Sequence, residues 1–124
     1  MQFDGVGSEQ GGIRPGVIFQ NNKGNTHSPN IIALPLSSSM KKMGMPTHVL
    51  LRAHQHGLAK DSIVLCENPQ RMSKERILHK ITHLSDGAMR EIAKASLLAS
   101  AVLSFLSLED IEAIREQSIR LNGF

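Results

Sequence analysis

An arginine and a serine in the first third of the chain have side chains suited to phosphate chemistry. Arg14 carries a guanidinium group, which stays charged at neutral pH and presents a planar fork of N–H donors. Ser37 carries a hydroxyl, which both donates and accepts hydrogen bonds. Glu9 adds a carboxylate near Arg14 in the sequence, able to orient the arginine or to take a proton. Together, these three groups would bind a phosphodiester and assist proton transfer at it.

The loop around Glu9 contains the glycines Gly7, Gly11 and Gly12. Glycine tolerates a positive φ and lets the backbone approach a ligand closely, so this loop could offer N–H donors to a phosphate. A simply flexible loop explains the same composition equally well. An arginine before a strand and a serine within a run of serines also occur on inert surfaces. Residue types alone therefore leave the chemistry open.

Four strands are predicted ahead of the helices, because apolar and β-branched runs alternate with segments rich in turn residues. Their expected bounds are residues 14–21, 30–36, 47–52 and 62–66. The connections at residues 37–45 and 54–60 are expected to be loops. Strands first and helices later predict a mainly β domain, in which an antiparallel sheet or small barrel has helices packed on one side.

Two helical segments are expected after the fourth strand. Ser73 is placed to cap a short helical turn that reaches His79, and Ser85 is placed to begin a longer helix. The apolar residues of that longer helix recur at helical spacing at Ile92, Leu98, Val102 and Phe105.

A final helix is expected from Leu108 to about Leu121. Residues 107–110 have the capping-box pattern, and Leu106 and Ile111 are spaced as a hydrophobic staple. Residues 1–104 and 105–124 are thus expected to be a main domain and an additional C-terminal helix. The apolar face of this helix would cover a sheet edge, extend a dimer interface or pack on the preceding helix; it is formed by Ile111, Ile114, Ile119 and Leu121.

The chain has 124 residues, enough for one domain with its own core, and its net charge of +3 is unevenly distributed. Residues 1–84 contain ten Lys/Arg and five Asp/Glu, whereas residues 85–124 contain four and six. A basic body suits a polyanion such as RNA. Four Phe and no Tyr or Trp argue against a base-stacking platform. Nucleic-acid contacts would therefore rely on phosphate binding, backbone groups and side-chain hydrogen bonds.

The single cysteine, Cys66, excludes an internal disulfide framework and fits a reducing cytosol. Its apolar neighbours at residues 63–65 predict a buried structural thiol rather than a nucleophile. Six histidines are present, but no Cys, Asp or Glu spacing completes a metal site with them, and we expect them to be structural or solvated. Residues 95–108 are apolar but shorter than the roughly 20 residues of a membrane span, so they predict a packed helix.

Several short motifs follow one another along the chain in a fixed order. They begin with Gly-Ser-Glu-Gln-Gly-Gly-Ile-Arg-Pro and continue to the end of the fourth strand, at residues 7–15, 25–29, 35–38, 45–49, 61–64 and 66–68. Each motif alone is weak, but the ordered series resembles the MazF/PemK family of toxin endoribonucleases from about Gly5 to Leu103. The resemblance covers most of the chain and implies an SH3-like small antiparallel β-barrel with helices.

The resemblance also implies a function. Members of this family are metal-independent, sequence-specific endoribonucleases that cleave single-stranded mRNA in the cytoplasm, so RNA binding, and DNA binding as well, are expected. The expected partners are a second copy, forming a homodimer, and an antitoxin whose flexible acidic tail covers the RNA groove. No cofactor and no metal are implied. A catalytically degenerate member that binds RNA or an antitoxin is the alternative. Related barrels also act as gyrase poisons, but they lack the glycine-rich loop found here.

The resemblance assigns roles to individual residues. Arg14 matches the arginine at the scissile phosphate, Ser37 matches the catalytic threonine, and Glu9 matches a glutamate needed for toxicity. Serine keeps the threonine hydroxyl but loses the methyl group that restricts its rotamer, so activity is expected to be reduced or retained. The implied RNA-binding residues lie in the glycine-rich loop, the serine turn and the end of the fourth strand: Ser8, Gln10, Gly11, Gly12, Ser38, Glu67 and Asn68.

Two departures from the family pattern carry expectations of their own. The sequence starts inside the loop that follows the family's first strand, so we expect a barrel that lacks this strand and has an unpaired edge. The family's Arg-Thr-Ile-Asp run reads Gln70-Arg71-Met72-Ser73 here, which displaces the arginine by one residue. One step along a strand turns a side chain to the other face, so an RNA contact or ion pair would be lost.

The nuclease interpretation depends on one spatial condition. Arg14 and Ser37 must lie close together on the same face of the sheet to bind one phosphodiester. Placement on opposite faces would remove the nuclease assignment and leave only the family likeness.

Overall fold

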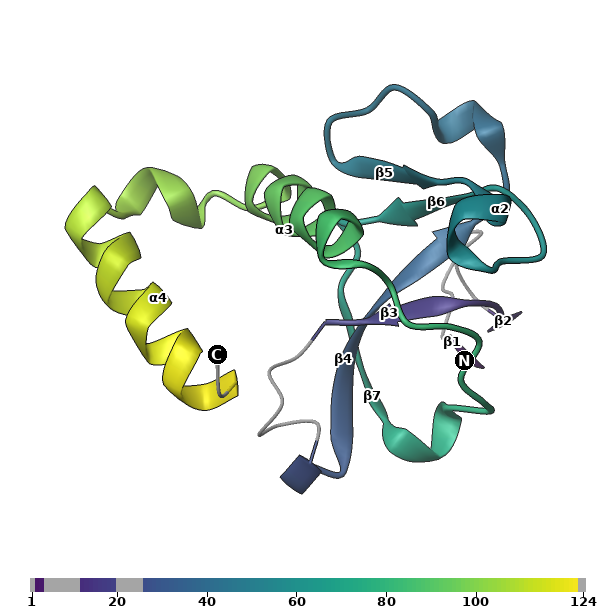
Figure 1. Ribbon diagram of the computed structural model, residues 1–124, viewed down its shortest axis with the longest axis horizontal. Helices are drawn as coiled ribbons and strands as arrows, with labels where there is room; N and C mark the ends of the chain where they lie inside the picture. The colour runs from purple at the N-terminus through teal and green to yellow at the C-terminus, as the bar shows by residue number, and fades with distance from the viewer. Residues whose placement is uncertain (1, 4–11, 20–25, 123–124) are drawn as a thin grey trace.

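The computed structural model describes residues 2–3, 12–19 and 26–122 (Figure 1). Strand β1 (Gln2–Phe3) pairs with β2 (Gly12–Ile13) in a short two-stranded unit. Five further strands form the main antiparallel sheet: β3 (Gly16–Ile18), β4 (Asn30–Ser37), β5 (His48–Leu51), β6 (Ser62–Leu65) and β7 (Gln70–Ser73). The four predicted strands are therefore present. Three of them are shorter than expected, β4 extends one residue further, to Ser37, and β7 is an additional strand.

The long strand β4 is the centre of the sheet. Along one edge it pairs with β3, and along the other it pairs first with β7 and then, at Leu36 and Ser37, with β6. Strand β6 in turn pairs with β5. The prediction of a mainly antiparallel β fold with C-terminal helices is confirmed, but the sheet does not close into a barrel, since no pairing among the described residues joins β3 to β5.

Within the described ranges, helix α2 (Ala53–His56) connects β5 to β6, and helices α3 (Asp86–Ala99) and α4 (Leu108–Asn122) follow the strands. Short 3-10 turns, labelled η, occupy Met40–Lys42, Lys74–Arg76 and Val102–Phe105. The loops expected at residues 37–45 and 54–60 thus each contain a helical turn. The turn capped by Ser73 ends at Arg76 and does not reach His79.

Serine side chains define the ends of α3. The Ser85 Oγ accepts a hydrogen bond from the Ala88 N–H at 3.2 Å, which confirms the predicted start. The prediction that Val102 and Phe105 belong to this helix is wrong, because α3 ends at Ala99. The Ser100 Oγ accepts the Val102 N–H at 3.2 Å and so offers the backbone an alternative to another helical turn.

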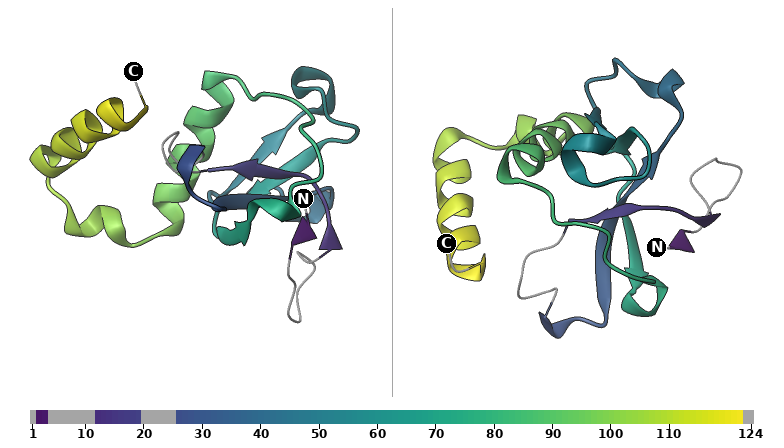
Figure 2. Two further views of the ribbon diagram at one scale, coloured as in Figure 1. Left: turned by 90° about the horizontal axis from the view of Figure 1, so that it is seen from below. Right: turned by 45° about the vertical axis from the view of Figure 1, so that its right-hand side comes forward.

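Helix α3 covers one face of the sheet, and the main core lies between them (Figures 1 and 2). Leu34 and Leu36 of β4 face this core, and Ile92 at its centre is completely buried. Alternation along β4 sends Ile31 and Ala33 to the other face, where they pack with Met72. Even-numbered residues of β4 thus face α3, and odd-numbered residues face the opposite side of the sheet.

The prediction of a buried thiol at Cys66 is confirmed. Cys66 is 3% exposed within the main core, and its Sγ contacts the Val64 carbonyl oxygen at 3.8 Å. Burial raises the pKa of the Cys66 thiol to about 11. The protonated form therefore dominates at neutral pH, which argues against a nucleophilic role.

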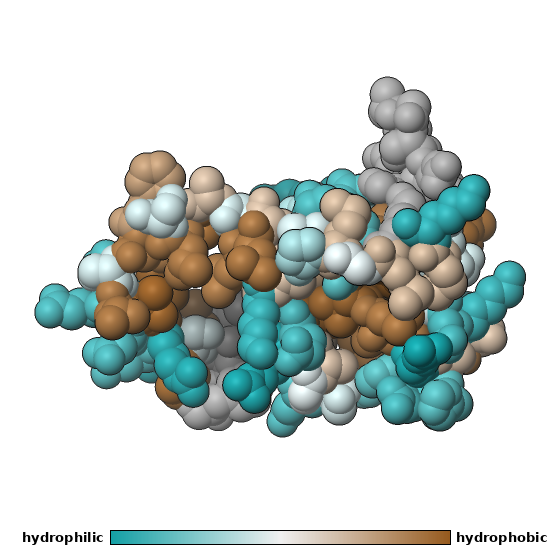
Figure 3. Space-filling model, turned by 90° about the horizontal axis from the view of Figure 1, so that it is seen from above, coloured by the Kyte–Doolittle hydropathy of each residue, from teal (hydrophilic) through white to brown (hydrophobic). Residues whose placement is uncertain are grey.

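The segment after α3 differs from the rest of the chain because it projects from the body. Figures 1 and 2 show α4 standing away from the sheet, joined to α3 by η3. Seen from above, hydrophobic side chains gather at this end of the molecule (Figure 3). In the parts of the chain that the structure describes, α4 neither covers a sheet edge nor packs along α3, which were two of the three packing modes expected for it. Within the described part of the chain, none of the helices has the length and apolar character needed to cross a membrane.

Candidate functional site

The pairing of β3 with β4 determines where Arg14 lies relative to Ser37. Val17 pairs with Leu34, and Gly16 pairs with Pro35. At the next position along both strands, the Leu36 N–H donates to the Pro15 carbonyl oxygen at 3.0 Å. Continuing this register by one residue sets Arg14 opposite Ser37. Residues directly opposed in an antiparallel pair share a face, with Cβ atoms about 4.5–5.5 Å apart.

Local hydrogen bonding orients Ser37 at the end of β4. Its hydroxyl oxygen accepts the Ser39 N–H at 3.2 Å, which forms a turn leading into the 3-10 turn Met40–Lys42. The hydroxyl proton remains able to donate to another group. Ser37 is half-buried, as is Arg14, whereas Ser38 is exposed. Two predicted catalytic residues therefore lie together, with their side chains partly enclosed.

A row of paired residues extends across the sheet from Ser37. Ser37 pairs with Ile63 of β6, and Ile63 pairs with Leu50 of β5. Because their neighbours Leu36 and Val64 face α3, this row lies on the opposite face of the sheet. We refer to the face that carries Ser37, Ile63 and Leu50 as the site face.

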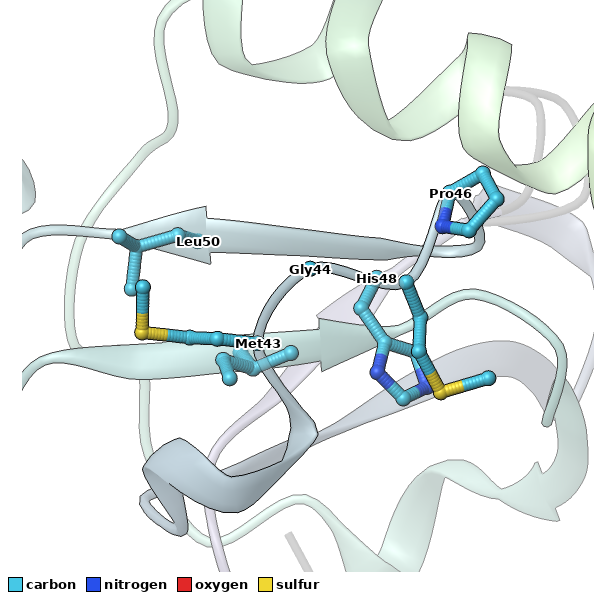
Figure 4. Close-up of a pocket in the computed structure, with 7 residues that line it drawn as sticks. Met43, Gly44, Pro46, His48 and Leu50 are labelled. Atoms are coloured by element: carbon cyan, nitrogen blue, oxygen red, sulfur yellow. The ribbon is translucent and has the colours of Figure 1, made fainter.

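A pocket of about 320 Å³ opens on the site face. Strand residues His48, Leu50 and Ile63 form part of it, and the loop before β5 forms the rest (Figure 4). Gly44 has a φ of +87°, a conformation that side-chain-bearing residues rarely adopt, and this allows the loop to turn beside the pocket. The full lining is Met43, Gly44, Met45, Pro46, His48, Leu50 and Ile63.

The side chains of His48 and Glu67 are paired at hydrogen-bonding distance at the edge of this pocket. The His48 Nε2 lies 2.8 Å from the Glu67 Oε1. The histidine side chain is only 5% exposed, while the glutamate is 38% exposed, so the carboxylate stays accessible beside a histidine held in place. Asn68 follows, half-buried in a turn in which its N–H donates to the Leu65 carbonyl oxygen at 3.1 Å.

The sequence predicts that His48 is structural or solvated, and the family resemblance implies that Glu67 binds RNA. Both residues belong to motifs that carried the family resemblance, but the motifs are separate in sequence. The pairing of His48 with Leu65 brings the histidine next to the strand that leads to Glu67. Each motif by itself therefore marks its residue as part of the family pattern. Only the pairing of the strands shows that the two residues meet.

The remaining predicted site residues belong to the glycine-rich loop, most of which lies outside the described residues. Ser8, Glu9, Gln10 and Gly11 lie outside the described residues, and Gly12 pairs with Phe3 in the β1–β2 unit. The expected role of Glu9 therefore remains a prediction, as do those of its neighbours.

The displaced arginine, Arg71, lies on the other face of the sheet. It pairs with Ile32 of β4, which has the same parity as the core residue Leu34. Gln70 pairs with Ala33 and so has the parity of Ser37. Arg71 is exposed and belongs to the face opposite the site. The one-residue shift has therefore turned this arginine away from Ser37.

The loop after β5 is held by Asp61. One carboxylate oxygen accepts the Ala53 N–H at 2.7 Å, and the other lies 3.3 Å from Nη1 of Arg52. The Ala53 hydrogen bond and, secondarily, Arg52 lower the pKa of the Asp61 carboxyl group. No group of three His, Cys, Asp or Glu residues suited to a metal ion occurs in the described ranges.

Comparison with known proteins agrees with this architecture. The family described as "PemK-like, MazF-like toxin of type II toxin-antitoxin system" matches residues 1–99. Endoribonuclease EndoA of Bacillus subtilis is 39% identical over 100 residues, which cover 81% of this chain and 86% of that protein. Endoribonuclease MazF of Staphylococcus saprophyticus is 44% identical over 89 residues, covering 72% and 74%.

A solved structure shares the fold. The Mycobacterium tuberculosis toxin MazF-mt6 superposes with a TM-score of 0.63 at 26% identity, covering 69% of this chain and 84% of that one. The family match, the two curated relatives and the shared fold agree with the ordered motifs of the sequence. The chain therefore belongs to the family of PemK-like, MazF-like toxins of type II toxin-antitoxin systems.

Proposed function

We propose that this protein is a metal-independent endoribonuclease that cleaves single-stranded mRNA at a specific short sequence, as the toxin of a toxin-antitoxin pair. The relatives named endoribonucleases support the activity. The observation that carries the proposal is the β3–β4 register, which sets Arg14 opposite Ser37 on the face that holds the pocket.

The reaction begins with the ribose 2′-hydroxyl beside the scissile phosphate. Its oxygen forms a bond to phosphorus, the bond from phosphorus to the 5′-oxygen breaks, and a 2′,3′-cyclic phosphate and a free 5′-hydroxyl result. One proton leaves the 2′-hydroxyl and one reaches the departing oxygen. The transition state therefore needs positive charge near the phosphate oxygens and groups that move protons.

Arg14 supplies the positive charge. Its guanidinium donates in a fork to two phosphate oxygens and stabilises the charge that develops on them. Ser37 donates its hydroxyl proton to the same phosphate, while its oxygen is held by the Ser39 N–H. Glu9 is the proposed proton acceptor or the group that orients Arg14. This arrangement uses a fixed cation of the protein in the role that a metal ion has in other nucleases.

The pocket and the His48–Glu67 pair provide RNA contacts beside the scissile phosphate. Unstacked bases of single-stranded RNA expose both their faces and their hydrogen-bonding edges. The apolar walls suit a base face, and the exposed part of Glu67 accepts hydrogen bonds from base N–H groups. The proposed RNA-binding set also includes Ser38, Asn68 and the glycine-rich loop with Ser8, Gln10, Gly11 and Gly12. Base-specific contacts of this kind give sequence specificity.

The partners follow from the same function. A toxin of this type is neutralised by an antitoxin, and an acidic, flexible segment of the antitoxin would compete with RNA for Arg14. A homodimer acting in the cytoplasm is part of the proposal. Binding to DNA, also implied by the resemblance, stays a prediction.

The test is cleavage of single-stranded RNA by the purified full chain in the presence of EDTA, with the cut sites mapped by sequencing. Arg14→Ala is expected to lower kcat/KM by about 10²–10³, because one preformed electrostatic contact to the transition state is lost. Arg71→Ala is the matched control, since this exposed arginine lies on the other face. Circular dichroism and thermal unfolding of both variants establish that the fold is retained.

A folded wild-type chain that cuts no RNA of any sequence would contradict the proposal. In that case, binding of RNA or of an antitoxin without cleavage would support the second candidate, a catalytically degenerate member of the family. The observation in favour of this candidate is the position of Arg71, turned to the face opposite Ser37. Equal loss of activity in Arg14→Ala and Arg71→Ala would contradict the assignment of the site face.

A further inference from the structure

The C-terminal part of the chain exposes an unusual amount of apolar surface. Nine of the sixteen large hydrophobic residues exposed in the described ranges lie after residue 96, so this surface is concentrated at one end. Monomeric proteins rarely expose contiguous apolar patches larger than a few hundred Å², and larger ones mark interaction sites. These residues are Leu97, Leu98, Val102, Leu103, Phe105, Leu108, Ile114, Ile119 and Leu121.

Helix α4 presents its apolar side chains on one side. At 100° per residue, they fall within an arc of about 160°, the width typical of a helix that packs against another element. Phe105 and Leu108, at the start of the segment, are 83% and 80% exposed. The members of this apolar face are Leu108, Ile111, Ile114, Ile119 and Leu121; Ile111 is half-buried and the other four are exposed.

Local hydrogen bonds form the start of the helix, and no described strand or helix of the body packs along it. Ser107 and Asp110 make the reciprocal capping box, with the Asp110 N–H 3.1 Å from Ser107 Oγ and the Ser107 N–H 3.0 Å from Asp110 Oδ2. Figures 1 and 2 show α4 projecting from the rest of the molecule. The family match ends at residue 99, before this helix begins. An isolated helix of this length is marginal in water, so its apolar face requires a covering surface.

We propose that α4 pairs in antiparallel orientation with α4 of a second copy of this chain. The charges along the helix support this choice of partner. Residues 108–114 contain three acidic residues and no basic one, whereas residues 115–121 contain two arginines and one glutamate. Antiparallel pairing around a two-fold axis sets the acidic half of each helix against the basic half of the other.

The same charges disfavour other arrangements. Parallel pairing would place the acidic halves side by side and align the two helix dipoles in the same direction. An acidic partner segment would meet the acidic half of α4. At 100° per residue, Arg115 falls within the apolar arc, whereas Arg120 falls on the polar side of α4, 4.0 Å from Glu116 of its own helix. Arg115 is therefore the arginine placed to meet an acidic residue of the second helix.

The first experiment measures self-association of the full chain by sedimentation equilibrium, without RNA. Ile114→Lys places a charge on the apolar face and is expected to raise the dissociation constant at least tenfold. Ala113→Lys adds the same charge at the neighbouring exposed position on the polar side, and is expected to have little effect. Equal dissociation constants for both variants and wild type, or equal weakening by both variants, would overturn the proposal.

The second experiment determines orientation by thiol cross-linking. Leu108→Cys and Ile119→Cys place thiols at opposite ends of the same side of α4, and Cys66 is buried and so is poorly accessible. Antiparallel pairing predicts that a mixture of the two variants cross-links between unlike chains more than either variant cross-links alone, and that adding Ile114→Lys removes this product. The proposal would be overturned by stronger cross-links between like chains or by the absence of any cross-link. It would also be overturned if α4 became buried only when antitoxin is added.

Both measurements are independent of RNA cleavage. A protein that does not cleave RNA can therefore still be tested for α4 pairing. A negative result for α4 pairing would likewise leave the proposed nuclease function untouched.

Discussion

The site face of the sheet and the C-terminal segment derive their structure from different interactions. On the site face, residues from distant parts of the sequence are brought together by strand pairing, as with Ser37 and Ile63 or His48 and Glu67. In α4, the defining hydrogen bonds join residues three positions apart, Ser107 and Asp110. The sheet that carries the site face packs its other face on a core with Ile92 at its centre, whereas the apolar face of α4 is open to solvent.

This comparison shows what each kind of interaction contributes. Local caps are sufficient to place the start of a helix, but they do not cover its apolar face. Long-range pairing covers apolar surface and at the same time positions functional side chains. We therefore expect substitutions in the two regions to have different effects on stability, activity and association.

The largest contrast is expected between two isoleucines on different helices. Ile92→Ala removes methyl groups from the completely buried centre of the core and should lower the free energy of unfolding by about 2–5 kcal/mol. Ile114→Ala removes the same groups from the exposed face of α4 and should change it by less than about 0.5 kcal/mol at low protein concentration. Urea denaturation measures both. Similar losses would show that α4 packs on the body in solution.

The next effect concerns the hydroxyl at the end of β4. Ser37→Ala removes a hydrogen bond to a charged phosphate, which is worth about 1.5–3 kcal/mol, and should lower the cleavage rate roughly 10- to 100-fold. Ser37→Thr restores the hydroxyl with a more restricted rotamer and should keep or raise the rate. Single-turnover cleavage of a short RNA measures this. Unchanged cleavage by Ser37→Ala would remove this residue from the proposed mechanism.

A smaller contrast is expected between the two helix caps. Ser85→Ala and Ser107→Ala each remove a capping hydrogen bond worth about 0.5–2 kcal/mol. Because α3 packs on the sheet, the loss at Ser85 should lower the unfolding free energy of the whole domain. The loss at Ser107 should instead increase hydrogen exchange in α4 while the sheet stays protected. Equal exchange of α4 in wild type and Ser107→Ala would show that another contact maintains this helix.

The smallest effect is a pH dependence at Asp61. Its pKa is lowered in the folded state, so its contribution to stability is fully present above the unfolded-state pKa, about 3.9, and is lost as the pH falls through the folded-state value. Asp61→Asn should therefore be less stable than wild type at pH 7, and this difference should shrink toward pH 3. Denaturation at the two pH values tests this, with Glu91→Gln on α3 as a control for net charge. A difference that persists at pH 3 would contradict the assigned cause.

Some of the architecture was predictable because its causes are local. The apolar strands at residues 30–36 and 62–66, the caps at Ser85 and Ser107 and the burial of Cys66 follow from residue types and spacing within short segments. The ordered motifs also led to the family, which the comparisons confirm. The end of α3 was missed because Val102 and Phe105 continue the helical spacing, while the hydrogen bond of the Ser100 hydroxyl ends the helix.

Only the tertiary structure decided which residues meet. The facing positions of Arg14 and Ser37, the contact between His48 and Glu67 and the turning of Arg71 to the other face all depend on strand register. Register is determined by which apolar side chains are buried together, and a shift of one residue exchanges the two faces of a strand. By itself, the sequence determined the starts of α3 and α4, the buried strands and the family. The composition of the site face and the exposure of α4 were decided by pairing and burial between distant segments, since these depend on the whole chain.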